Sequence, residues 1–218
     1  AGTGKSRTVR SFVSTLRDRV RADFERKIQD LARRDRNDVE AGVKIQKLRK
    51  QKEEALRHVC QLAAPTGCAS FQLKFGASTL HRIFGVPVGY CGPWRNKKDA
   101  RFQKMKDRMV HSRLFVMDEM SMIGRTMLGK IEFKVRDTVG QKVGAGGEDL
   151  MLAGKDCVLA GDPKQAPPLG DEPMWREGEY QKRGVNKPNG SDCTPPGAKT
   201  TKELVRLGMM TRNTFQDV

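Results

Sequence analysis

The sequence predicts an α/β fold in which helices flank a parallel sheet. Three short apolar runs have the length of buried strands, and they lie within "VCQLAAPTG", "RLFVMDE" and "DCVLAGD". Segments with a helical spacing of apolar residues separate these runs. Strands that alternate with helices form parallel sheets with right-handed crossovers, so these observations together indicate the fold class.

Two basic helices are expected before the first strand. From Ser6 to about Leu31, apolar residues recur every three or four positions, as in an amphipathic helix. A break at "RRDRND" precedes a second, interrupted apolar stripe over residues 39–59. Residues 7–57 contain 16 Lys and Arg against 9 Asp and Glu. This excess fits either a solvated helical face or a basic surface beside a nucleic acid.

The elements that follow are shorter. We expect a loop leading into a short helix over 76–87, a loop over 89–99, and helices over 100–112 and 120–139. The last strand, "DCVLAGD", follows a turn at "VGAGGED". Residues 163–199 are rich in Pro, Gly and charge, which is typical of loops. A helix over 201–210 and the start of a strand at 214–218 complete the prediction.

Composition points to a polyanionic partner. The formal net charge of +16 over 218 residues favours nucleic acid first and anionic membrane surfaces second. No apolar run is long enough to span a bilayer, and the N-terminus has no apolar signal region, so we expect no membrane segment and no secretion. The five cysteines contain no C-x-x-C pair, which favours a reducing compartment over a metal site or disulfide framework.

The first residues, "AGTGKS", contain the second half of a phosphate-binding loop. In the pattern G-x-x-x-x-G-K-[ST], backbone N–H groups surround the phosphates, the Lys reaches the β- and γ-phosphates, and the Ser or Thr holds Mg²⁺. Gly4, Lys5 and Ser6 match these last three positions, and a helix follows at once. The leading Gly of the pattern would precede Ala1.

Polar residues follow two of the predicted strands. Asp118 and Glu119 end "LFVMDE", where a first acid can hold magnesium and a second can polarise the attacking water. Gln165 follows the strand end at Gly161-Asp162, within "VLAGDPKQAPP". An uncharged amide at this position can hydrogen-bond a γ-phosphate or its water.

Taken in order, GTGKS, "APTGCAS…STLHRIF", "VMDEMSM" and "AGDPKQAPP" resemble the motifs of superfamily-one DNA helicases of the Pif-type and RecD-like branch. The resemblance implies a RecA-like P-loop NTPase domain that uses ATP and Mg²⁺. Residues 1–218 would form the first motor domain, truncated at both ends, with a basic helical insertion at 17–57 and a loop-rich segment at 170–200. The implied nucleotide-binding residues are Gly2, Thr3, Gly4, Lys5, Ser6, Asp118 and Gln165.

Within this set, the resemblance implies particular roles. Ser6 and Asp118 would hold the magnesium, Glu119 would activate water, Lys5 would bind phosphate, and Gln165 would sense the γ-phosphate. Single-stranded DNA would contact residues from two further motifs, Pro65-Thr66-Gly67 and the Thr-x-His element of Thr79 and His81. His81 can equally be a core or capping histidine. The implied activity is 5′-to-3′ movement on single-stranded DNA in repair, recombination and telomere maintenance.

The resemblance also implies parts outside this chain. The arginine finger is expected beyond Val218, with Arg212 a candidate by residue type only, and the second RecA-like domain is expected to be missing. We therefore expect a monomeric fragment with little activity of its own. The family's compartments would be the nucleus or mitochondrion in a eukaryote, and otherwise the cytoplasm.

Two other functions fit parts of the pattern. A different P-loop enzyme, such as a nucleotide or small-molecule kinase, would share the phosphate loop, although the Gly-Asp-x-x-Gln-x-Pro-Pro segment argues against it. A non-catalytic nucleic-acid-binding fragment of a degenerate helicase gene would also be basic. Stimulation of ATP turnover by single-stranded DNA separates a helicase from both.

Overall fold

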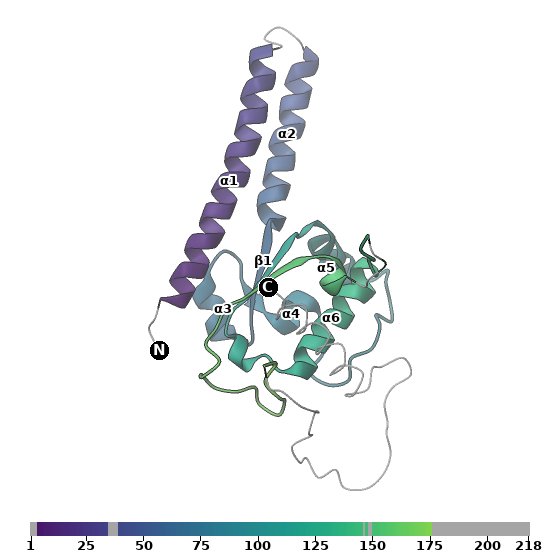
Figure 1. Cartoon of the computed structure of the whole chain (residues 1–218). Coiled ribbons are helices and arrows are strands. Elements are labelled where there is room, and N and C mark those ends of the chain that lie inside the picture. Colours follow the sequence, from purple (N-terminus) through teal and green to yellow (C-terminus); the bar gives the residue numbers. More distant parts are fainter. Residues whose placement is uncertain (1–3, 35–38, 146, 148–149, 176–218) are drawn as a thin grey trace.

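The described part of the chain contains a parallel sheet, as the sequence predicted, and this sheet has four strands. The computed structural model describes residues 4–34, 39–145, 147 and 150–175. The strand order is β2-β1-β3-β4, and every neighbouring pair is parallel (Figure 1). The strands are β1 (Cys60–Ala64), β2 (Ser78–Thr79), β3 (Leu114–Met117) and β4 (Asp156–Leu159).

Helices cover both faces of this sheet. The α-helices are α1 (Lys5–Arg34), α2 (Val39–His58), α3 (Gly67–Leu73), α4 (Leu80–Phe84), α5 (Ala100–His111) and α6 (Arg125–Val139). Two short 3₁₀ helices are η1 (Met120–Met122) and η2 (Met151–Ala153). None of the described helices is both long and apolar enough to cross a membrane.

Alternate residues of β1 and β3 face two separate cores, which is why these two strands read as continuous apolar runs. The strand β4 was also predicted to be buried, but it lies at the edge of the described sheet and its residues are exposed or half-buried. On one face, Leu62 and Val116 pack with Val9 and Val13 of α1 and with Leu73 of α3. On the other face, a larger core fills the space under α4, α5 and α6. It includes Ala63, Phe84, Phe115, Met117, Ile131 and Val135, and the rings of Phe84 and Phe115 meet edge to face at 5.0 Å.

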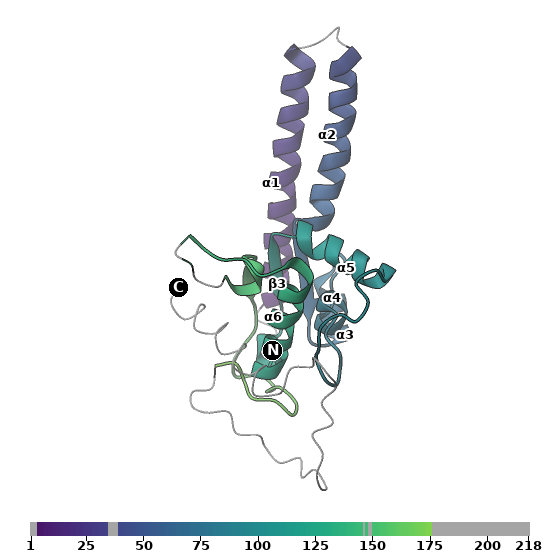
Figure 2. The same ribbon diagram turned by 90° about the vertical axis from the view of Figure 1, so that its right-hand side faces the viewer.

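The two N-terminal helices form a hairpin that extends beyond the sheet (Figures 1 and 2). Their observed bounds, 5–34 and 39–58, agree with the predicted helices over 6–31 and 39–59. Val9 and Val13 are the only described residues of α1 that are buried, so the helix leaves the core after its N-terminal part. Residues 17–34 and 39–57, where the basic insertion was predicted, lie in this hairpin.

The chain after β3 differs from the prediction. A single helix was expected over 120–139, but η1 ends at Met122, Ile123 is extended, and α6 begins only at Arg125 after the N-cap Gly124. The backbone N–H of Met120 donates to the carbonyl of Ala160, which holds this segment across the ends of β3 and β4. That pairing between strand ends prevents a continuous helix.

Two further differences are small. The loop expected before α4 contains the two-residue strand β2, which pairs with Ala63 and Ala64. Residues 163–175 contain no helix or strand, as expected. The remainder of the predicted loop, the helix over 201–210, Arg212 and the strand at 214–218 lie outside the described residues.

Candidate nucleotide-binding site

The start of α1 lies against the carboxyl ends of β3 and β4. Gly4 has a φ of 78°, a left-handed conformation that favours glycine, and its carbonyl accepts a hydrogen bond from the N–H of Thr8. Lys5 Nζ donates to Gln165 Oε1 at 3.0 Å, and Ser6 Oγ donates to Asp118 Oδ2 at 3.4 Å. The structure therefore brings Lys5, Ser6, Asp118 and Gln165 together. Gly2 and Thr3 lie outside the described residues.

Asp118 is the buried acid of this site, with 2% of its surface exposed. Its N–H donates to the carbonyl of Ala63, which continues the pairing of β3 with β1 by one residue. Its Oδ1 accepts the N–H of Glu119 at 2.9 Å, so Oδ2 is the oxygen that faces Ser6. A buried carboxylate held in one orientation is suited to binding a cation.

Glu119 adopts a left-handed backbone conformation that non-glycine residues rarely occupy, with φ of 53° and ψ of 49°. Such backbone strain costs on the order of 1–2 kcal/mol and is found most often at functional sites. The turn separates the half-buried Glu119 side chain from the buried Asp118 and leads into η1. Ser121 within η1 is fully buried, and its hydroxyl has no hydrogen-bond partner among the described residues.

Gln165 is positioned by a tight turn after β4. The Oδ1 of Asp162 accepts the N–H of Lys164, and the carbonyl of Asp162 accepts the N–H of Gln165, both at 3.0 Å. Gly161 comes so close to the turn after β3 that a Cβ there would lie 2.6 Å from the backbone nitrogen of Met120. The absence of a side chain at Gly161 therefore allows the loop that carries Gln165 to pack directly against the turn that carries Asp118 and Glu119.

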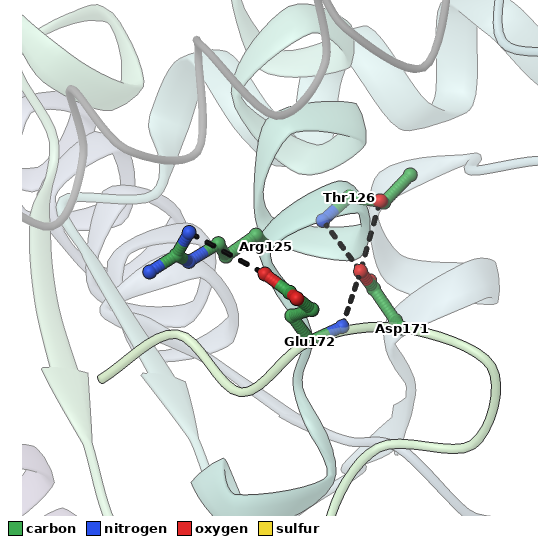
Figure 3. A network of polar contacts seen from close by, with 4 residues as sticks. All are labelled: Arg125, Thr126, Asp171 and Glu172. Atoms are coloured by element: carbon green, nitrogen blue, oxygen red, sulfur yellow. Dashed lines mark hydrogen bonds and ion pairs between the residues drawn. The ribbon is translucent and has the colours of Figure 1, made fainter. Parts of the chain in front are cut away.

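The far end of the same loop is fastened to the start of α6 (Figure 3). The Asp171 carboxylate accepts hydrogen bonds from the N–H groups of Thr126, Met127 and Glu172 and from the hydroxyl of Thr126, at 2.9–3.2 Å. Arg125 and Glu172, both buried, form an ion pair at 3.5 Å. The sequence did not reveal these residues, because Thr126 and Asp171 are 45 positions apart and Arg125 and Glu172 are 47 positions apart, and no local pattern connects them.

The residues predicted to contact DNA lie at the carboxyl ends of β1 and β2. Thr66 Oγ1 accepts the N–H of Ala69 and caps α3, and Thr79 Oγ1 accepts the N–H of Arg82 and caps α4. Thr79 pairs in register with Ala64, so Pro65, Thr66 and Gly67 begin beside the end of β2. His81 is half-buried on α4. These residues lie at the same carboxyl end of the sheet as the nucleotide site, but they follow β1 and β2 instead of β3 and β4.

A lysine and a hydroxyl at the start of a helix, facing a buried carboxylate and a glutamine at neighbouring strand ends, define a RecA-like P-loop nucleotide-binding domain. The chain belongs to the PIF1-like helicase family, whose model matches residues 44–178. The matched range contains Asp118, Glu119 and Gln165.

Solved structures of Pif1 proteins are similar to this chain. Pif1 from Bacteroides bound to ssDNA shares 28% identity over 56% of this chain and 27% of that chain, with a TM-score of 0.40. Pif1 helicase from Candida albicans shares 23% identity over 78% of this chain and 28% of that chain, with a TM-score of 0.48. The chain thus spans about a quarter of their length. The comparison with curated proteins found no match.

Proposed function

We propose that this chain is the ATP-binding part of the first motor domain of an ATP-dependent DNA helicase. The supporting observation is the convergence of residues that are far apart in the sequence. The contact between Lys5 and Gln165 joins positions 160 apart, and the contact between Ser6 and Asp118 joins positions 112 apart. The chain's membership of the PIF1-like helicase family supports the same function.

The residues present fit a magnesium–nucleotide complex. The Lys5 ammonium contacts a neutral amide, and no carboxylate of the described residues forms an ion pair with it, so its charge remains available for an anionic phosphate. Ser6 and Asp118 supply a hydroxyl and a carboxylate oxygen, the hard ligands that Mg²⁺ prefers. Magnesium-bound ATP, when present, supplies the phosphoryl group for hydrolysis.

Each residue then has a distinct task. Lys5 neutralises phosphate charge, and Ser6 and Asp118 hold the magnesium. Glu119 orients a water and accepts its proton, which its position beside Asp118 allows. Gln165 hydrogen-bonds the γ-phosphate in place of its present contact with Lys5, so loss of that phosphate alters the loop that Asp171 joins to α6.

We propose single-stranded DNA as the partner, held at the ends of β1 and β2 by Pro65, Thr66, Gly67, Thr79 and His81. The hydroxyl groups of Thr66 and Thr79 accept helix-cap hydrogen bonds and retain their own protons for donation to a backbone phosphate. The family resemblance supports movement in the 5′-to-3′ direction and roles in repair, recombination and telomere maintenance as further parts of this proposal.

The test measures ATP hydrolysis with and without single-stranded DNA, in this chain together with any further domain that its gene encodes. Lys5→Ala should weaken ATP binding, whereas Glu119→Gln should preserve binding and lower the hydrolysis rate by about 10²–10⁴-fold. Lys142→Ala, an exposed lysine on the β4 side, is the matched control. Equal rates in all variants would overturn the residue assignments, and a rate indifferent to DNA would favour a kinase.

A further inference from the structure

A polar hollow of about 330 Å³ lies at the outer edge of β1, away from the nucleotide site. It exists because β2 pairs only with Ala63 and Ala64, which leaves the first half of β1 without a neighbouring strand on that side. Gln61 of β1 and Ser78 of β2 line the hollow, together with the C-terminal end of α2, α4 and α5. The hollow therefore sits at the base of the basic hairpin.

Three arginines from three different helices line this hollow. Arg57 is the penultimate residue of α2, Arg82 lies on α4, and Arg108 lies on α5. Among the described residues, none of these guanidinium groups has a side-chain hydrogen bond or a carboxylate partner. The nearby carboxylate of Asp107 is paired with His111 at 3.1 Å instead. Three unneutralised cations around one polar hollow favour an anionic ligand.

His58 adds a further polar group to the hollow. Its Nδ1 is buried and has no hydrogen-bond partner among the described residues, and its ring centroid lies 5.7 Å from that of His111. Burial lowers the pKa of His58; the carboxylate of Asp107 opposes this effect, while His111, Arg108 and Arg57 add to it. Burial thus disfavours the charged form of His58, so the arginines rather than His58 supply the positive charge of the hollow.

We propose that this hollow binds a backbone phosphate of nucleic acid through Arg57, Arg82 and Arg108. Guanidinium groups match phosphate oxygens with paired N–H donors, which suits a tetrahedral anion. Nucleic acid is favoured over a free anion because of what adjoins the hollow. The hollow lies at the base of the basic α1–α2 hairpin. Arg82 also lies on the same short helix, α4, as His81, which is among the residues proposed to hold DNA.

This inference rests on the proposed DNA-binding function, and it adds a contact that the helicase motifs do not include. The experiment measures the affinity of the whole 218-residue chain for fluorescently labelled single-stranded DNA over a series of salt concentrations. The variant Arg57→Gln/Arg82→Gln removes two exposed arginines from the hollow. The variant Arg113→Gln/Lys142→Gln removes two exposed cations away from the β2 edge of the sheet and is the charge-matched control.

Each phosphate contact that is lost should reduce the slope of log K against log salt by about 0.7 for a single strand. We expect a reduction of at least that size in the arginine variant and a smaller one in the control, with unchanged circular dichroism in both. Equal slopes in the two variants would refute the hollow as a DNA contact. Direct binding of inorganic pyrophosphate that the arginine variant abolishes, without any change in DNA affinity, would show a small-anion site and refute the DNA contact too.

If the wild-type chain does not bind single-stranded DNA at any salt concentration, the proposed function fails rather than the hollow alone. A variant with Thr66→Ala and His81→Ala provides the second comparison. If that variant loses affinity for single-stranded DNA, while Arg57→Gln/Arg82→Gln has the salt dependence of the wild type, the proposed function is supported and the further contact is refuted. The two proposals can therefore be judged separately.

Discussion

Replacing Asp171 with alanine tests how the loop of Gln165 is held. The Asp171 carboxylate accepts the N–H groups of Thr126 and Met127 in the first turn of α6, the hydroxyl of Thr126 and the N–H of Glu172. Asp171→Ala leaves the donors at the start of α6, and the N–H of the buried Glu172, without this acceptor. It also removes a negative charge from the positive end of the helix dipole.

The expected loss of stability follows from the missing hydrogen-bond acceptor and the missing negative charge. Removing a helix-capping side chain costs about 1 kcal/mol and at most about 2, and losing a carboxylate at a helix N-terminus adds about 0.3–1 kcal/mol. We therefore expect Asp171→Ala to lower the free energy of unfolding by about 2 kcal/mol, and Asp171→Asn, which keeps one acceptor oxygen, by about 1 kcal/mol.

Urea unfolding measures this loss. With an m value of about 2 kcal/mol per M, the midpoint of the alanine variant should fall by about 1 M. Asp156→Ala is the matched control, because Asp156 is exposed at the start of β4 and its carboxylate has no hydrogen bond or ion pair among the described residues. Equal midpoints for the two alanine variants would refute the reasoning.

Three other changes have definite expected results. Gly161→Ala should destabilise the chain by about 1–3 kcal/mol and weaken ATP binding, because its Cβ would meet the backbone of Met120, whereas Gly89→Ala meets no atom within 4 Å. Gly42→Ala, inside α2 with open space around it, should raise the melting temperature and stabilise the chain by about 0.5–1 kcal/mol. Burial holds the pKa of His58 below its ordinary value of 6.5, so the unfolded state binds more protons and stability should fall as pH drops below 6.5. Urea midpoints at pH 7 and pH 5 should therefore differ less in His58→Gln than in the wild type. A Gly161→Ala variant as stable as Gly89→Ala, an unchanged melting temperature for Gly42→Ala, or an equal pH effect in His58→Gln would contradict the corresponding argument.

Local patterns were sufficient to predict the elements that position the site. Apolar runs ending in Asp118 and before Asp162 identified β3 and β4. Burial on both faces explains why β3 lacks polar alternation, whereas β4 lies at the edge of the described sheet and was wrongly expected to be buried. The helical spacing after Ser6 identified α1. The family resemblance implied one nucleotide site for Lys5, Ser6, Asp118 and Gln165, and the structure brings these residues together.

The features that were missed depend on contacts between distant positions. The pairing of Met120 with Ala160 replaces the first turn of the expected helix with η1, and periodicity around Met120 contains no sign of it. Asp171 and Glu172 lie in a segment that reads only as loop, and their partners become evident only when α6 is placed. The arginine hollow likewise unites three helices at residues 57, 82 and 108.

The proposed function requires Ser6 and Asp118 to act on one magnesium–nucleotide complex. A double-mutant cycle of magnesium–ATP affinity with Ser6→Ala, Asp118→Asn and the combined variant tests it most directly. Residues that share one ligand should show a coupling energy of about 0.5–3 kcal/mol, so the combined variant should bind ATP more tightly than the sum of the single losses predicts. Strictly additive losses, or single variants with wild-type affinity, would contradict the claim.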